Sequence, residues 1–100
     1  MKKLHQIARN IEIETFIKEY LETNYATDVL DEKFHDEFTV RFGGKQKMHY
    51  WGSCPNSLAI RWLKKLYDQG ILERGRVGIP EHEIGFPNWV YSYTLKNSNR

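Results

Sequence analysis

The sequence predicts an α+β fold that is mostly helical, with three helices followed by a two-stranded antiparallel hairpin. Apolar side chains recur with helical spacing in three stretches before residue 70, and they alternate with polar ones at 89–95. One hundred residues suffice for one domain with a modest core. We therefore treat 1–100 as a single domain, with a short arm allowed at 1–10 and a flexible polar tail at 97–100.

The first helix is predicted to run from about Ile11 to Asn24. Its apolar residues repeat with a period close to 3.6 residues and form a stripe wide enough to bury against a core. Residues 4–11 show the same period with a shifted phase, and the shift falls near Asn10, a favourable capping residue. The sequence therefore predicts a helix start at this point, with a helical or extended arm at 2–9 before it.

A second helix is predicted to begin at Thr27 or Asp28, either of which can cap it. Leu30, Phe34 and Phe38 recur every four residues and mark its buried face. The following residues, 39–42, alternate between polar and apolar, which indicates a short strand. Gly43 and Gly44 then interrupt any regular element.

The third helix is predicted at 57–69, capped by Asn56 or Ser57 and ended by Gly70. One half of its surface is apolar, with Leu58, Ala59, Trp62, Leu63 and Leu66. The other half is polar and mainly basic, with Ser57, Arg61, Lys64, Lys65 and Asp68. Strands are predicted at 71–79 and 89–95, and the alternation in the second is typical of a half-buried antiparallel strand.

Charge is distributed unevenly along the chain. Residues 11–40 carry nine acids and two bases, whereas residues 41–76 carry eight bases and two acids. A basic stripe confined to one part of a fold is the pattern expected for contact with a phosphate backbone. The same division would equally allow an acidic face of one copy to meet a basic face of another.

Several function classes find no support in the sequence. No apolar run approaches the roughly 20 residues that span a bilayer, and the basic N-terminus lacks the apolar segment of a secretory signal. The single Cys54 indicates a reducing cytoplasm. We expect no metal, cofactor, small-molecule substrate or catalysis, because Cys54 and the histidines lack ligand spacing and Gly43-Gly44-Lys45 lacks the context of a phosphate loop. The histidines are His5, His35, His49 and His82.

The connection at 43–55 interleaves basic and aromatic side chains, among them Lys45, Lys47, Tyr50 and Trp51. Cations for phosphates and rings for stacked bases together bind single-stranded nucleic acid. The alternative is a loop or short strand whose rings enter the core while its lysines stay in water.

The run Leu63-Lys64-Lys65-Leu66-Tyr67-Asp68-Gln69-Gly70-Ile71-Leu72-Glu73-Arg74, with Val90-Tyr91-Ser92-Tyr93-Thr94-Leu95 further on, resembles the winged helix-turn-helix family. The resemblance implies a three-helix core, a two-stranded wing and a third helix in the DNA major groove. It assigns DNA contacts to Asn56, Ser57, Arg61, Lys64 and Lys65, and backbone contacts to Arg74 and Arg76. The chain departs from the family in its long second connection and in its acidic wing tip, Glu81-His82-Glu83.

The leading hypothesis is therefore a small protein that binds double-stranded DNA, sequence-specifically or generally, as a transcriptional regulator or a phage or plasmid control protein. Lys45 and Lys47 join the candidate contacts, and a homodimer is compatible with reading two half-sites. The alternative is a winged-helix module that binds protein instead of DNA. Its contacts would be an exposed aromatic patch of Tyr50, Trp51, Phe86 and Trp89.

Overall fold

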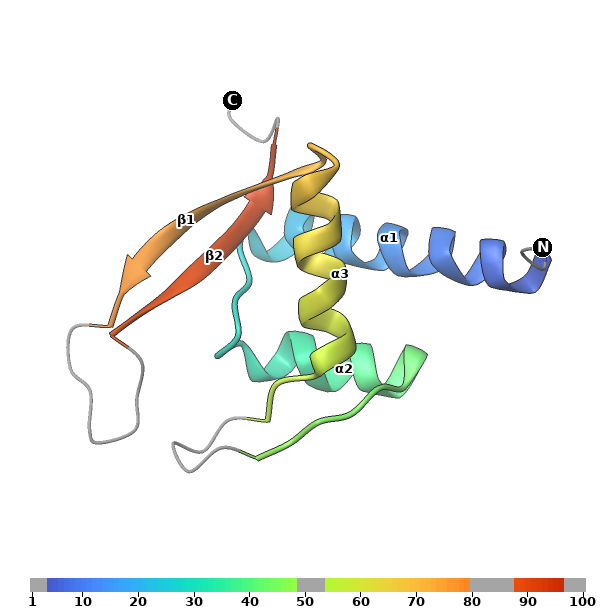
Figure 1. Ribbon diagram of the computed structural model, residues 1–100, viewed down its shortest axis with the longest axis horizontal. Coiled ribbons are helices and arrows are strands. Elements are labelled where there is room, and N and C mark those ends of the chain that lie inside the picture. The colour runs from blue at the N-terminus through green and yellow to red at the C-terminus, as the bar shows by residue number, and fades with distance from the viewer. Residues whose placement is uncertain (1–3, 49–53, 80–87, 97–100) are drawn as a thin grey trace.

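The computed structural model describes residues 4–48, 54–79 and 88–96. Three helices come first and an antiparallel two-stranded sheet follows them (Figure 1). The elements are α1 (Leu4–Asn24), α2 (Glu32–Phe42), α3 (Ser57–Asp68), β1 (Leu72–Gly78) and β2 (Trp89–Leu95). This layout confirms the predicted α+β, winged-helix-like fold, and the last three elements lie within one residue of their predicted bounds.

Helix α1 is continuous from Leu4, so the break predicted near Asn10 is wrong. Its core-facing residues all lie in the second half, from Ile13 to Leu21. Extending a helix that already exists costs little compared with starting one. In addition, the Arg9 guanidinium donates a hydrogen bond to the Phe42 carbonyl at the end of α2. The shifted phase in the sequence therefore marks a change of face within one helix.

Helix α2 begins later than predicted, because Asp31 is its cap and not Thr27 or Asp28. The Asp31 carboxylate accepts a hydrogen bond from the Phe34 N–H at 3.3 Å. Thr27 is engaged elsewhere: its N–H and carbonyl pair with Tyr93 of β2 at 3.1 and 2.9 Å. This pairing fastens the α1–α2 connection to the free edge of β2.

The short strand predicted at 39–42 is also wrong, since these residues form the last turn of α2. The Thr39 hydroxyl donates to the His35 carbonyl one turn earlier, at 2.8 Å. The Phe42 ring packs against Phe38, with 5.1 Å between centroids. Tertiary packing thus overrides the local alternation. Gly43, with φ of 79°, ends the helix.

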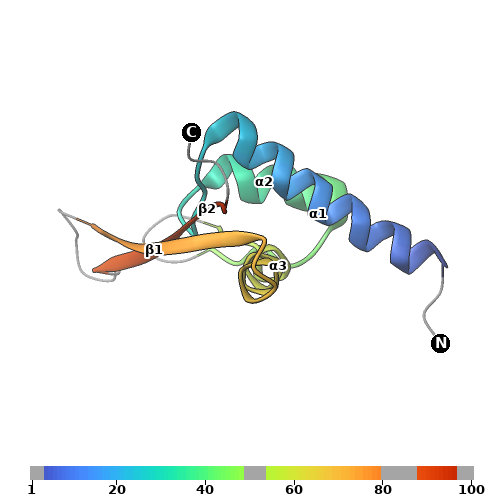
Figure 2. The ribbon, with the colours of Figure 1, turned by 90° about the horizontal axis from the view of Figure 1, so that it is seen from above.

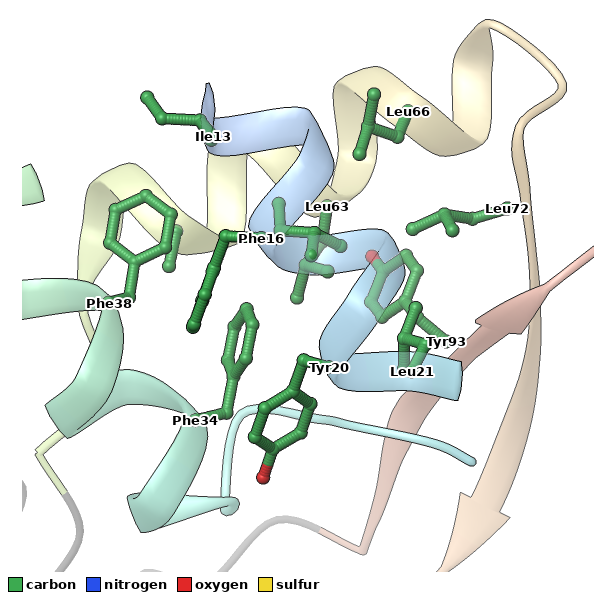
Figure 3. Packing of buried hydrophobic residues seen from close by; sticks show 12 residues of the cluster. Ile13, Phe16, Tyr20, Leu21, Phe34, Phe38, Leu63, Leu66, Leu72 and Tyr93 are labelled. Atoms are coloured by element: carbon green, nitrogen blue, oxygen red, sulfur yellow. The ribbon is translucent and has the colours of Figure 1, made fainter. Parts of the chain in front are cut away.

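The core lies where all three helices and the base of the hairpin meet (Figure 3). Phe34 of α2 stacks on Phe16 of α1 with 5.8 Å between ring centroids, and Phe38 meets Phe16 edge-on at 6.2 Å. Helix α3 adds leucines and an alanine, and the hairpin adds one residue from each strand. The buried cluster is Ile13, Phe16, Ile17, Tyr20, Leu21, Phe34, Phe38, Ala59, Leu63, Leu66, Leu72 and Tyr93.

A tight turn joins α3 to the hairpin. Gly70 has a φ of 82°, and its N–H donates to the Tyr67 carbonyl at 3.0 Å. The N–H of Ile71 donates to the Leu66 carbonyl at 2.9 Å. These two bonds form a Schellman motif, which confirms Gly70 as the residue that ends the helix. Strand β1 then pairs with β2 from Leu72 opposite Leu95 to Gly78 opposite Trp89.

The helices form two groups when the molecule is seen from above. Figure 2 shows α1 and α2 together on one side of α3, with the hairpin extending away from the helices. One surface of α3 therefore faces away from α1 and α2. Across residues 4–48, 54–79 and 88–96, no helix is both long and apolar enough to cross a lipid bilayer.

Candidate nucleic-acid interface

The start of α3 is fixed by a fully buried side chain, Asn56. Its Oδ1 accepts hydrogen bonds from the N–H groups of Leu58 and Ala59, at 2.8 and 3.1 Å. Its Nδ2 donates to Thr39 Oγ1 at 2.7 Å and to the Gly43 carbonyl at 2.9 Å. Both ends of the amide are thus occupied inside the fold. Asn56 was predicted to contact DNA from the exposed face of α3, and its burial removes it from that face.

The backbone before α3 is held by a second buried group, His35 of α2. The Asn56 N–H lies 3.0 Å from His35 Nδ1, which must accept because an amide N–H can only donate. The other ring nitrogen, Nε2, lies 3.0 Å from the Asp28 carbonyl and so carries the proton. Burial lowers the pKa of His35, and the ring is therefore neutral.

The same region explains one glycine of the 43–55 connection. Gly44 has a φ of 99°, and a Cβ built there would lie 2.6 Å from Asn56 Oδ1. The segment 45–47 then runs beside the segment 55–57. The Ser57 N–H donates to the Lys45 carbonyl at 3.0 Å, and Gln46 and Asn56 form an isolated antiparallel β-bridge. The ends of the long connection are thus paired with each other directly before α3.

Lys45, Lys47 and Ser57 are exposed around this paired base. They line one groove of about 620 Å³ together with Gln46, Pro55 and Ile60. The structure therefore places the two lysines of the connection beside the first turn of α3.

The outward surface of α3 carries the other predicted cations. Arg61, Lys64 and Lys65 are exposed, and they line a shallow depression with Asp68 and Gln69. Lys64 forms an exposed ion pair with Asp68 at 2.8 Å, and Lys65 lies over the Trp62 ring at 4.3 Å. Arg61 makes no hydrogen bond or ion pair within the described part of the chain. Its guanidinium is the most available donor on α3.

The two arginines of β1 are stacked on aromatic rings. The Arg74 guanidinium lies 4.1 Å from the centroid of the Tyr67 ring and 3.9 Å from that of Tyr91. Arg76 lies 4.3 Å from the centroid of the Trp89 ring. Stacking leaves the edge of a guanidinium available for hydrogen bonds, and Arg74 already donates one of them from Nη1 to the Tyr93 hydroxyl at 3.4 Å. These ring contacts were not predicted from the sequence. Each arginine lies over the ring two residues before its own partner in the hairpin register, which pairs Arg74 with Tyr93 and Arg76 with Tyr91.

The strand at 89–95 does not bury one face of its alternation. Tyr93 is buried, but Trp89 and Tyr91 on the same face are 38% and 36% exposed, whereas Val90 on the other face is 6% exposed. The hairpin moves away from the helices toward its tip (Figure 1). The rings of Trp89 and Tyr91 therefore do not reach the core, and arginines stack on them instead. Val90 lines an apolar groove with Val29, Ile60 and Leu63.

The remaining candidate residues form no second site within the part of the chain that the structure describes. Tyr50, Trp51, Phe86, His49 and the wing tip at 81–83 lie outside the described residues. Cys54 is partly buried, and its carbonyl accepts a hydrogen bond from Gln46 Nε2 at 2.7 Å. Within residues 4–48, 54–79 and 88–96, no group of three or more histidine, cysteine or acidic side chains could hold a metal ion.

In comparisons with known proteins, no family model, curated protein or solved structure matches this chain. The function is accordingly argued from the residues themselves.

Proposed function

We propose that this protein binds double-stranded DNA, with α3 in the major groove and the hairpin against the adjacent backbone. The proposal is supported above all by Arg61, an exposed guanidinium on the outward surface of α3 that has no ion pair or hydrogen bond with any of the described residues. Lys45 and Lys47 lie beside the start of the same helix. The role we propose for such binding is that of a small transcriptional regulator or a phage or plasmid control protein.

The cations would make different kinds of DNA contact according to their chemistry. Arg61 would pair bidentately with a guanine edge, the commonest specific contact in a major groove. Lys64 and Lys65 on α3, with the two lysines of the connection, would neutralise phosphates. The stacked guanidiniums of Arg74 and Arg76 would bind backbone oxygens, which position a protein without specifying sequence.

The test is a titration of a short random-sequence duplex by fluorescence anisotropy at two salt concentrations. Binding should weaken with salt, with a logarithmic slope of about −0.9 for each phosphate contact. The variant Arg61→Glu/Lys64→Glu should lose binding and keep its fold, because both side chains are exposed. The control, Lys18→Glu/Lys33→Glu, makes the same change of net charge on α1 and α2. Equal loss of binding in the two variants would contradict the proposal.

A second candidate is a protein-binding module, and one observation favours it. The groove between α3 and β2 has a volume of about 300 Å³ and is lined mainly by apolar and aromatic side chains, including Ile60, Val90 and Tyr91. An apolar side chain of a partner would fit such a groove. A well-folded protein that binds no duplex at low salt would favour this candidate over DNA.

A further inference from the structure

The first half of α1 carries an apolar stripe that the described part of the domain leaves exposed. Leu4, Ile7 and Ile11 are 84%, 41% and 60% exposed. They recur at the i, i+3 and i+7 positions of a helix face. Figure 1 and Figure 2 both show this end of α1 projecting beyond α2 and α3. Single exposed apolar residues are ordinary, but three on one helix face form a surface suited to a partner.

The stripe faces almost directly away from the core. With about 100° per residue, its mean direction differs by roughly 150° from that of the buried residues in the second half of α1. One half of α1 thus packs on its own domain, while the other half presents its apolar side chains outward. This change of direction along α1 explains the shift in the phase of the apolar residues near Asn10.

We propose that a second copy of this chain covers the stripe, with the two α1 helices antiparallel about a twofold axis close to Ile7. The stripe is self-complementary in that arrangement. Leu4 of each copy lies opposite Ile11 of the other, and Ile7 lies opposite Ala8. A twofold interface requires this kind of matching, because the same surface serves both sides.

The charges of α1 favour a second copy in the antiparallel direction. Residues 4–10 carry Arg9 and no acid, whereas residues 11–24 carry four glutamates and one lysine. Antiparallel packing places the positive dipole end of each helix beside Glu12 and Glu14 of its partner. Parallel packing would instead place glutamates beside glutamates.

The surface beside the stripe is hollowed on both sides. One groove of about 170 Å³ separates α1 from α3 and is lined by Ile7, Ile11 and Trp62. Another of about 460 Å³ separates α1 from the end of α2 and is lined by Ile11, Phe16 and Phe42. Side chains of a helix laid on the stripe would enter these grooves, as ridges of one helix pack into grooves of another.

The test is sedimentation equilibrium of the full chain without DNA, so its result is independent of the proposed function. A single helix pair lies at the small end of specific interfaces, and we expect a Kd of about 10 to 100 µM. The variants Ile7→Glu and Ile7→Lys should each be monomeric at concentrations where the parent dimerises. Mixing the two should restore the dimer, because the opposite charges then face each other across the axis.

The matched control changes Val40 of α2, which is 86% exposed and lies outside the stripe, to Glu or Lys. These variants should dimerise like the parent, and circular dichroism should show unchanged helix content in all of them. A parent that stays monomeric at about ten times the expected Kd would overturn the proposal. So would Ile7 variants that still dimerise alone, or a mixture of them that remains monomeric.

Discussion

Two polar regions of this protein adjoin α3 and differ in how many of their side-chain groups have partners within the fold. The first is the buried network at the start of α3, made by His35, Thr39 and Asn56. The second is the basic surface of α3 and β1, including the exposed Arg61 and Arg76 and the partly buried Arg74. In the network, every side-chain group has a partner within the fold. On the basic surface, donors remain available.

The two regions should therefore contribute to different properties: the buried network to stability and the basic surface to binding. A buried polar group that loses its partner pays the full cost of desolvation, so changes in the network should act mainly on the free energy of unfolding. An exposed cation contributes little to stability through its own ion pairs, so changes on the basic surface should act mainly on affinity. Changes at three residues test this separation, in decreasing order of expected effect.

The largest effect is expected for Asn56→Ala. The change removes the cap of α3 and leaves Thr39 Oγ1 and the Gly43 carbonyl without their buried donor. We expect the free energy of unfolding to fall by about 2 to 4 kcal/mol, measured by urea denaturation. Ser57→Ala, at the exposed neighbouring position, should change it by less than about 0.5 kcal/mol. Similar values for the two variants would refute the role given to the network.

A second variant tests the hydrogen bonds donated by the Asn56 amide separately from its capping of α3. Asn56→Asp keeps an acceptor for the N–H groups of Leu58 and Ala59, but it replaces the amide donor with a carboxylate 2.9 Å from the Gly43 carbonyl. Stability should therefore fall although the cap survives. If Asn56→Asp matched the parent, capping alone would explain the role of Asn56.

The next effect is a pH dependence from His35. Burial lowers the pKa of His35 in the folded protein, so below about pH 6.5 the unfolded chain binds a proton that the folded chain resists. The contribution of the neutral ring is complete above that pH and is lost as the pH falls. The slope should approach at most about 1.4 kcal/mol per pH unit.

The measurement is urea denaturation between pH 5 and pH 8. His35→Gln should lower stability at every pH and flatten the slope, whereas His5→Gln, at an exposed site, should leave the slope unchanged. NMR of the ring nitrogens should show the proton on Nε2. A slope that persists in His35→Gln would assign the pH dependence to other groups.

The smallest effect is expected for Arg74→Lys on the basic surface. The charge is kept, but the flat group that stacks between Tyr67 and Tyr91 is lost. DNA affinity should fall several-fold at an unchanged salt slope, while Arg74→Ala should also reduce the slope by about 0.9. Anisotropy titration at several salt concentrations measures both quantities. Equal affinity of the Lys variant and the parent would show that the stacking does not contribute.

Much of the fold follows from local pattern. The periodicity of α3, Gly70 at its end and the alternation in β2 predict these elements within one residue of their observed bounds. The start of α2 and the continuity of α1 were not predictable in this way. Thr27 and Asn10 are both favourable capping residues in isolation, and only pairing with Tyr93 or support from Phe42 decides whether the cap is used.

The candidate site was likewise predictable from the sequence only in part. The sequence by itself determined that one half of α3 is basic, because helical spacing assigns each side chain to a face. Only the tertiary structure decided that Asn56 is buried, that Arg74 and Arg76 lie on rings and that Leu4, Ile7 and Ile11 face outward. Local sequence sets the direction of a side chain relative to its own element. What lies in that direction depends on residues distant in the chain.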